Sequence, residues 1–320
     1  MQEVLSAAQK VAEKSRFVRI DKRAPADFTE KLLEHGIDVP PWDSHYHFSG
    51  PPEEVLSYLL VVDTLNFCFW PERGKAKWEI TYKGEKLSGY YAMAASIKSA
   101  MASDIPITRA EFLGDISLPQ LKDILGGKGE LQLMEERVRA LNELGRLLLN
   151  DYGGNACGLV EESGRSAVKL ARLLAQKLTS FGDVAEYAGC EVFFYKRAQI
   201  FASDLHGALM GKGLGAFNDM ENLTCFADYK LPQVLRQLGI LCYDPFLEQR
   251  INQKILLKQG SPEEVEIRAN TVWAVELIRR GLETKGKCLR AYEIDWILWN
   301  MGQNKGFKVR PYHRTLTIFY

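Results

Sequence analysis

The sequence has no surplus of charge of either sign, and this limits the partners it can attract. Its 41 Lys and Arg residues balance its 41 Asp and Glu residues, so the chain has no overall field that would gather a long polyanion. We therefore expect a small substrate and no stable complex with DNA or RNA, although a local basic groove is compatible with this balance.

The sequence also lacks the patterns that bind zinc or build a disulfide framework. None of the six cysteines belongs to a C-x-x-C pair, and all lie in otherwise apolar segments: Cys68, Cys157, Cys190, Cys225, Cys242 and Cys288. In a chain of 320 residues this scatter is typical of reduced thiols in a core. The sequence therefore predicts a protein of a reducing compartment.

Long apolar runs are missing as well. The first 20 residues carry charges every few positions instead of the apolar centre of a signal peptide, and no run of 18 apolar residues occurs anywhere. We therefore expect a cytoplasmic protein without membrane contact. Nothing in the sequence demands an oligomer, so we expect a monomer.

Helical periodicity is the dominant pattern that the sequence does have. Apolar residues recur at helical spacing and predict helices at about residues 2–15, 53–64, 131–149, 165–180, 184–210 and 261–280. Alternation predicts a β-hairpin over Lys77–Tyr91 and a terminal strand over Thr315–Tyr320. Because no repeat or low-complexity linker interrupts the chain, we expect one mainly helical domain over residues 1–320 with a small β element. A subdomain division near residue 155 is compatible with this pattern.

Two short motifs predict where helices begin. In Ser261-Pro262-Glu263-Glu264, Ser261 is the expected N-cap and Glu264 closes a capping box. We expect this helix to end at Gly281, because a basic pair and then a glycine suit the last turn and the position after it. The string Thr108-Arg109-Ala110-Glu111 predicts a second capping box.

The pair His45-x-His47 is the first candidate for chemistry. On a strand both imidazoles would face one side, as in metal-dependent hydrolases. The chain has only five histidines, however, and no H-E-x-x-H string or second pair completes a metal site. We therefore expect a loop anchored by packing and no metal, while a direct substrate contact from His45 stays open.

An aromatic segment is the second candidate. The string LNFCFWPE places Phe67 and Trp70 close to Asn66. Aromatic faces can stack on a planar heterocycle, and an amide can hydrogen-bond to the edge of a base. Ordinary core packing explains each of these residues about equally well.

Two carboxylates complete the candidates. In FFYKRAQIFASD, Asp204 follows an apolar helical face. In CFADYKLPQVLRQL, Asp228 precedes a helix that is predicted to begin near Leu231. A carboxylate at a helix N-terminus keeps its negative charge, and this is what stabilising a cationic transition state requires. Taken alone, both aspartates are also explained as caps or core anchors.

Taken together, five long segments resemble one family. The strings VVDTLNFCFW, FYKRAQIFASDL, LTCFADYKLPQVLRQLG, EEVEIRANTVWAVELI and PYHRTLTIFY resemble the queuosine salvage proteins, the queuosine 5′-phosphate N-glycosylase family, and the resemblance spans nearly the whole chain. It implies a helical bundle similar to helix-hairpin-helix DNA glycosylases, whose catalytic aspartate stands just before a helix in strings like V-D-T-H-V-x-R-V. Residues 227–234, A-D-Y-K-L-P-Q-V, fit that shape with Asp228 as the aspartate. The hairpin string L-P-G-V-G is absent upstream, which fits a mononucleotide better than duplex DNA.

The resemblance implies hydrolysis of the bond between queuine and ribose 5′-phosphate, without a metal or an organic cofactor. A carboxylate beside C1′ would stabilise the positive charge on the ribose, and Asp228 is the candidate. Asp204 would bind the guanine-like edge of the base, with Phe67 and Trp70 stacking on its faces. The remaining candidates are Glu266 or Asp63 for the base edge and, for the 5′-phosphate, Lys230, Lys196, Arg197 and His313.

Two other classes of function stay open. A metal-dependent hydrolase using His45 and His47 would lose activity to a chelator. A non-catalytic binder of queuine or of modified tRNA would release no base, and its binding to tRNA would depend steeply on salt.

Overall fold

The computed structural model describes residues 1–304, 306–307 and 310–320. The helices of this part of the chain are α1 (Gln2–Lys14), α2 (Ala24–His35), α3 (Pro52–Leu65), α4 (Tyr90–Ala102), α5 (Ala110–Asp115), α6 (Leu118–Leu125), α7 (Met134–Tyr152), α8 (Ala156–Glu162), α9 (Ala167–Lys177), α10 (Lys196–Ala208), α11 (Lys230–Gln237), α12 (Pro245–Asn252), α13 (Pro262–Thr284) and α14 (Ala291–Gln303). The strands are β1 (Val18–Ile20), β2 (Glu79–Tyr82), β3 (Glu85–Ser88), β4 (Val184–Tyr187), β5 (Cys190–Phe193) and β6 (Leu241–Tyr243). The prediction of a mainly helical chain with a small β element is confirmed.

The strands form three separate antiparallel pairs. β2 pairs with β3 and β4 with β5 as hairpins, whereas β1 pairs with the distant β6. The first hairpin lies within Lys77–Tyr91, as predicted from its alternation. No pair extends into a larger sheet among the described residues, so the helices supply most of the core.

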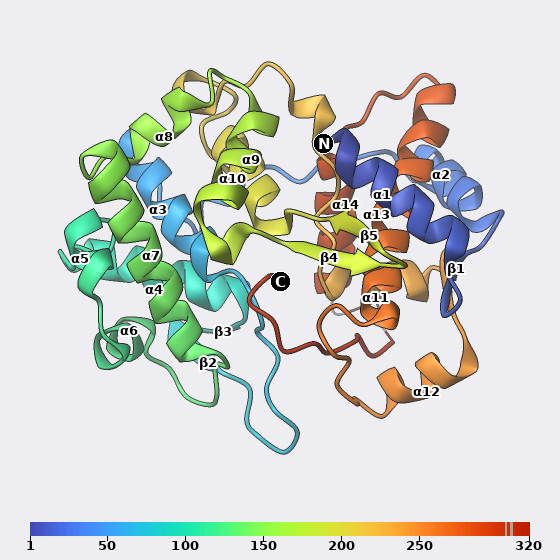
Figure 1. Cartoon of the computed structure of the whole chain (residues 1–320), viewed down its shortest axis with the longest axis horizontal. Coiled ribbons are helices and arrows are strands. Elements are labelled where there is room, and N and C mark those ends of the chain that lie inside the picture. The colour runs from blue at the N-terminus through green and yellow to red at the C-terminus, as the bar shows by residue number, and fades with distance from the viewer. Residues whose placement is uncertain (305, 308–309) are drawn as a thin grey trace.

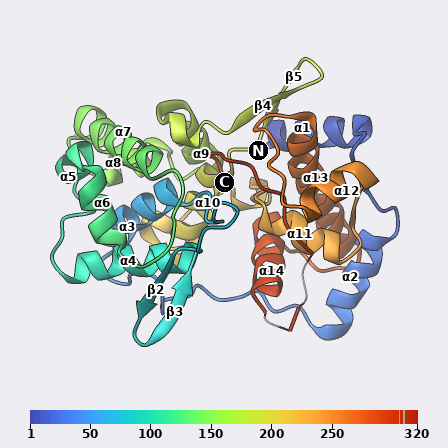
Figure 2. The ribbon, with the colours of Figure 1, turned by 90° about the horizontal axis from the view of Figure 1, so that it is seen from below.

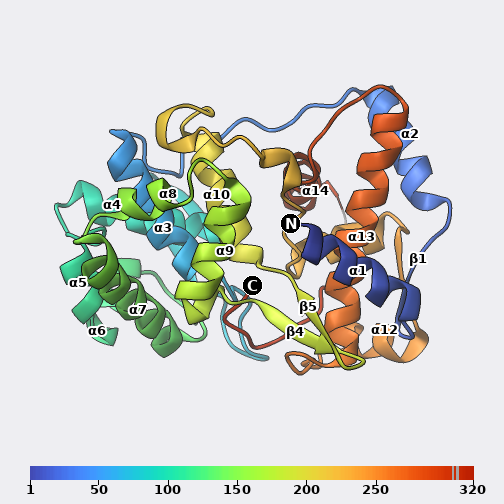
Figure 3. The same ribbon diagram turned by 45° about the horizontal axis from the view of Figure 1, so that its top comes forward.

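The helices gather in two groups with the C-terminal segment between them (Figure 1). Helices α3 to α8 lie on one side, and α1, α2 and α11 to α14 lie on the other, as a second view also shows (Figure 3). α1 and α2 pack against α13, which comes from the other end of the chain. The β2–β3 hairpin packs against α4 and projects outward from the first group (Figure 2). One continuous buried cluster runs through both groups, from Met1 to Leu298.

Most helix positions agree with the periodicity of the sequence. The helices expected at 2–15, 53–64, 131–149 and 165–180 are α1, α3, α7 and α9. None of the described helices is both long and apolar enough to cross a membrane.

The helix predicted at 184–210 is wrong in its first third. Residues 184–193 form the β4–β5 hairpin, and α10 begins only at Lys196. The hairpin turns at Ala188 and Gly189, whose φ angles of 50° and 76° match a two-residue turn with both central residues left-handed. Alanine is uncommon in such a turn, because its Cβ disfavours positive φ.

Helix ends also differ from expectation. Ser261 Oγ does accept the N–H of Glu264, but the Glu264 side chain accepts the N–H of Gly260, so the capping box is not closed. The helix continues past Gly281 to Thr284. A Cβ on Gly281 would lie 3.0 Å from Thr29 Oγ1, so this glycine lets α2 approach α13 and does not end the helix.

Two further local predictions are wrong. Thr108 lies inside a turn closed by the Arg109 N–H to Pro106 O bond, so α5 begins at Ala110 without a side-chain cap. Residues 315–320 form no strand, and their alternating burial comes from their position between the two groups of helices. Of the cysteines, only Cys68 and Cys225 are buried, although all six are free thiols.

Candidate active site

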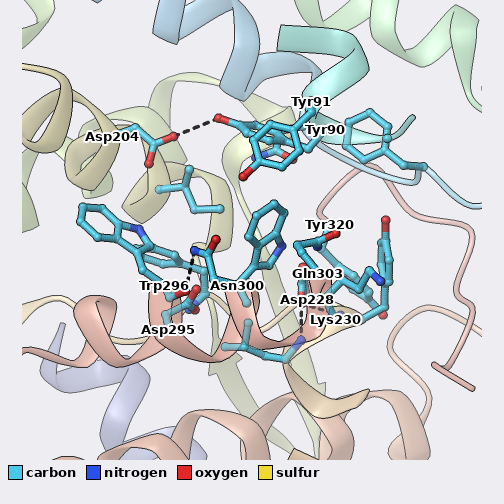
Figure 4. A pocket seen from close by; sticks show the side chains of 18 of the residues that line it. Tyr90, Tyr91, Asp204, Asp228, Lys230, Asp295, Trp296, Asn300, Gln303 and Tyr320 are labelled. Atoms are coloured by element: carbon cyan, nitrogen blue, oxygen red, sulfur yellow. Dashed lines mark hydrogen bonds between the residues drawn. The ribbon is translucent and has the colours of Figure 1, made fainter. Parts of the chain in front are cut away.

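A cavity of about 270 Å³ lies where the two groups of helices meet the C-terminal segment. Its wall comes from the loop at 40–47, the segment that follows α3, and the helices α4, α10, α11 and α14. Carboxylates, three lysines and many aromatic rings face it (Figure 4). This mixture of flat apolar faces and charged groups suits a ligand with a planar heterocycle and an anionic group.

Asp228 stands on the cavity wall directly before α11. Its Oδ1 accepts the backbone N–H groups of Lys230 at 2.6 Å and Leu231 at 2.9 Å, so the carboxylate caps the helix (Figure 4). Among the described residues, its second oxygen, Oδ2, has no hydrogen-bond partner. The residue is only 8% exposed. One oxygen is thus fixed by the helix, which holds the other toward the cavity.

Asp295 and Lys196 surround Asp228 from two other helices. Asp295 on α14 accepts the N–H of Phe226 at 2.7 Å, two residues before Asp228 in the chain, and burial raises its pKa well above the ordinary value. Lys196 is the first residue of α10, and its Nζ lies 3.5 Å from the carbonyl oxygen of Asn66. Burial lowers the pKa of Lys196, and the charge of Asp228 opposes this. The ammonium group is therefore held near Asp228, whose charge favours its protonated form.

Asp204 faces the cavity from α10, away from Asp228 (Figure 4). Its Oδ2 lies 3.4 Å from the hydroxyl of Tyr90, the first residue of α4. Burial raises the pKa of Asp204 to about 7. The same Tyr90 hydroxyl lies 2.9 Å from Nε2 of His47. These three side chains come from three separate segments and meet only in the folded chain.

Aromatic side chains form much of the rest of the wall. Trp299 contacts Tyr90 and Tyr91 edge-on, with ring centroids 6.3 and 5.4 Å apart. On the side of α11, Tyr229 and Tyr312 pack at 4.9 Å. These rings offer flat faces to a bound heterocycle.

Comparison with known proteins assigns the chain to a family. A family model described as queuosine salvage protein matches residues 45–320. The chain belongs to the queuosine salvage protein family. It is 45% identical to the queuosine 5′-phosphate N-glycosylase/hydrolase of Sphaerobacter thermophilus, over 99% of this chain and 97% of that protein. Proteins of the same name from Mus musculus and Schizosaccharomyces pombe are 38% and 32% identical, over 98% and 96% of this chain and 97% and 94% of theirs.

The cavity brings together six of the residues that the sequence of this chain predicts to bind or cleave the substrate. They are Asp228, Asp204, Asn66, Phe67, Lys230 and Lys196. Phe67 is only 1% exposed, because the guanidinium groups of Arg137 and Arg197 cover its ring at 4.2 and 4.9 Å from the centroid. Nearly all of its surface is therefore packed against protein, and little of it is left for a ligand.

The other predicted residues lie outside the lining of this cavity. Glu266 accepts three backbone N–H groups, from residues 16, 17 and 18, and the hydroxyl of Tyr187, so it anchors the segment after α1. Arg197 donates to the carbonyl oxygens of Asp63, Thr64 and Ser180. Trp70 is buried beneath the guanidinium of Arg314. These three side chains hold segments together around the cavity.

The predicted residues His45, His313 and Asp63 also lie outside the lining of the cavity, whereas His47 belongs to it. His45 is exposed, and His313 is buried against Tyr320, where burial lowers its pKa to about 3. His313 is therefore neutral and supplies no cation for a phosphate. Asp63 is fully buried behind the cavity, and burial raises its pKa well above the ordinary value.

The structure gives no support to a metal centre at the histidine pair. Both ring nitrogens of His47 are engaged, Nδ1 with the carbonyl oxygen of Asp43 at 2.6 Å and Nε2 with Tyr90. Within the described ranges, no three His, Cys, Asp or Glu side chains are grouped so that they could hold a metal ion.

Sequence reasoning missed Asp295, Tyr90 and Lys77, all of which line the cavity. Asp295 stands in the otherwise apolar string AYEIDWILW, and a carboxylate surrounded by core residues was the available signal. Tyr90 follows Gly89, whose φ of 65° ends the hairpin and starts α4. Nothing local distinguishes Lys77 from the other exposed lysines.

Proposed function

We propose that this chain hydrolyses the N-glycosidic bond of queuosine 5′-monophosphate and releases queuine. Relatives that are named for that activity match this chain over nearly their full length. The observation that carries the proposal is Asp228, a carboxylate fixed through one oxygen on the wall of an aromatic cavity, with its other oxygen available to a substrate. A nucleotide with its C1′ beside that oxygen would be held for cleavage.

Asp228 acts on the ribose in this proposal. Cleavage of the glycosidic bond builds positive charge on the ribose ring, and a carboxylate next to C1′ lowers the energy of that state. The bond to the base breaks with its electron pair on the base, and a water oxygen becomes bonded to C1′. Asp228 takes up the proton of this water, either in direct attack or after a covalent sugar intermediate.

Asp204 and the aromatic wall bind the base. Queuine is a 7-deazapurine, so it has no N7 that could be protonated to help it leave. The guanine-like edge offers donors and acceptors to Asp204 on α10, and Asn66 lines the cavity within reach of the same ligand. Trp299 and Tyr91, which line the cavity, supply faces for stacking.

Lys230 and Lys77 bind the 5′-phosphate. Both line the cavity, and Lys77 donates to Ser88 Oγ at 2.7 Å. Burial lowers the pKa of Lys230; the charge of Asp228 opposes this shift, and that of Lys77 adds to it. An anion placed beside both lysines would remove their mutual repulsion. Lys196 is the next candidate, because it is the other cation on the wall.

We expect Lys230→Gln to raise KM for queuosine 5′-monophosphate by about 10- to 100-fold, because a hydrogen bond to a charged group contributes about 1.5–3 kcal/mol. For the nucleoside queuosine, KM should stay unchanged, since it has no phosphate. The matched control is Lys86→Gln on the exposed face of β3. An equal increase in KM for both substrates would show that Lys230 does not bind the phosphate, and Lys196 would then be the candidate.

Several broader features belong to the same proposal. We infer one domain over residues 1–320, with a helical arrangement around Asp228 of the helix-hairpin-helix glycosylase kind. The continuous core from Met1 to Leu298 supports a single domain. The neutral charge supports binding of a mononucleotide without a stable nucleic-acid complex. The six free cysteines suit the reducing, cytoplasmic setting that we infer, together with a monomeric state. The chemistry above uses no cofactor.

Release of queuine from queuosine 5′-monophosphate, followed by chromatography with a chelator present, tests the function. Queuine appearing at a rate proportional to enzyme supports a metal-free glycosidase. Loss of release on chelation would favour a metal-dependent hydrolase, and binding without release would favour a carrier of queuine or modified tRNA.

A further inference from the structure

Three side chains form a hydrogen-bonded chain that ends in the cavity. His47 lies in the loop before α3, Tyr90 begins α4, and Asp204 stands on α10. His47 Nε2 and Tyr90 Oη are 2.9 Å apart, and Tyr90 Oη and Asp204 Oδ2 are 3.4 Å apart (Figure 4 shows the second contact). His47 Nδ1 is 2.6 Å from the carbonyl oxygen of Asp43.

Counting donors shows that His47, Tyr90 and Asp204 together hold one extra proton. They carry one proton more than they would with an ionised aspartate and a neutral histidine. The carbonyl of Asp43 can only accept, so His47 Nδ1 carries hydrogen. If Nε2 is bare, it accepts the single Tyr90 hydroxyl proton, and Asp204 must then donate to Tyr90 Oη. If Tyr90 donates to Asp204 instead, Nε2 must itself carry hydrogen. In either arrangement every contact is satisfied only with the additional proton.

The surroundings place this proton on Asp204. Burial lowers the pKa of His47; the backbone hydrogen bond to Asp43 and its charge oppose the shift, and the charge of Lys98 adds to it. Burial raises the pKa of Asp204 to about 7, against its contact with the Tyr90 hydroxyl, the charge of Lys196 and the hydrogen bond from Ser203. The carboxyl groups of Asp63 and Asp295 also face Asp204. The arrangement without separated charge, a carboxylic acid and a neutral imidazole, is therefore favoured.

We propose that Asp204 is the general acid that protonates the departing base, and that His47 and Tyr90 are positioning residues that keep its proton in place. This rests on the proposed function. As the bond between C1′ and the base breaks, the electron pair stays on the base, and the Asp204 proton moves to N3 or O6 of its guanine-like edge. The base leaves as a neutral tautomer, which suits a heterocycle without N7.

The balance closes with Asp228. The attacking water gives its oxygen to C1′ and its proton to Asp228, so one carboxyl loses the proton that the other gains. Once Asp204 is ionised, the Tyr90 hydroxyl turns from His47 to Asp204 and stabilises the carboxylate. Exchange with solvent returns both carboxyl groups to their starting states.

The pH dependence of kcat/KM for queuine release tests the proposal. The wild type should lose activity as pH rises through about 7, since Asp204 must be protonated. His47→Asn keeps an amide donor for Asp43 but lacks the Nε2 acceptor, so Tyr90 donates to ionised Asp204, and the alkaline limb should move down by about one pH unit. Tyr90→Phe removes that donor and should move the limb up. The matched controls are His35→Asn, on exposed α2, and Tyr46→Phe, whose hydroxyl bonds to Glu85.

Infrared spectra of the ligand-free protein give a second readout that needs no substrate. The wild type below pH 7 should show the C=O stretch of a protonated carboxyl that disappears in Asp204→Asn, and in His47→Asn this band should vanish at lower pH than in the wild type. Alkaline limbs that coincide in wild type, His47→Asn and Tyr90→Phe, or the absence of an Asp204-dependent band, would overturn the proposal. If the wild type releases no queuine, the proposed function and the role of Asp204 as general acid both fail. The infrared band still decides whether His47, Tyr90 and Asp204 together hold the additional proton.

Discussion

Asp228→Asn should lower kcat for queuine release by about 10³-fold or more, equivalent to about 4 kcal/mol of transition-state stabilisation. The side chain keeps its size, but the amide cannot neutralise the positive charge that develops on the ribose. Because this interaction grows only as the bond breaks, kcat should fall while KM changes little. Single-turnover release of queuine from queuosine 5′-monophosphate, followed by chromatography, measures the chemical step directly.

The fold of this variant should be unaffected. The amide oxygen of asparagine can still accept the N–H groups of Lys230 and Leu231 that Asp228 now accepts. Asp244→Asn is a matched control, because Asp244 caps α12 through the N–H groups of Phe246 and Leu247 and lies outside the cavity lining. Both variants should melt near the wild type, and only Asp228→Asn should be inactive. Wild-type turnover by Asp228→Asn would contradict this role and would indicate that Asp204 is the essential carboxylate.

The position of Asp228 at the start of α11 could be read from the sequence because capping is local. A carboxylate reaches the N–H groups two and three residues ahead of it, so the string A-D-Y-K-L contains the whole interaction. The same reasoning located Ser261 before α13. It did not reveal that α13 passes Gly281, because the reason lies in α2, far away in the chain.

The other side of the cavity could not be read in this way. His47, Tyr90 and Asp204 are separated by tens of residues, and only the packing of α4 and α10 around the loop brings them into contact. Glu266 is a predicted site residue that the fold uses elsewhere. From the sequence, a glutamate on a helix could accept hydrogen bonds from a base edge or from backbone N–H groups. The folded chain shows that Glu266 accepts backbone N–H groups.

The buried ion pair of Arg268 and Asp183 should be the most costly interaction to break among those that support Asp228. Arg268 on α13 donates to both oxygens of Asp183, at 2.9 and 2.5 Å, and its Nε donates to the carbonyl oxygen of Ala227 at 3.0 Å. Phe194 and Tyr320 pack against the guanidinium, with ring centroids 3.9 and 4.3 Å from its central carbon. The pair therefore joins the β4–β5 region to α13 and to the residue before Asp228.

We expect Asp183→Asn to lower the free energy of unfolding by about 3–5 kcal/mol, because it leaves a buried guanidinium facing a neutral amide. Urea unfolding followed by circular dichroism measures this loss. Asp151→Asn, which breaks the exposed pair with Lys177, should change the same quantity by less than about 1 kcal/mol. At low urea the folded Asp183→Asn protein should still release queuine faster than Asp228→Asn, since Asp183 only positions the backbone beside the carboxylate. Equal small losses in the two stability variants would mean that Glu264, 3.6 Å from Arg268, suffices to neutralise the guanidinium.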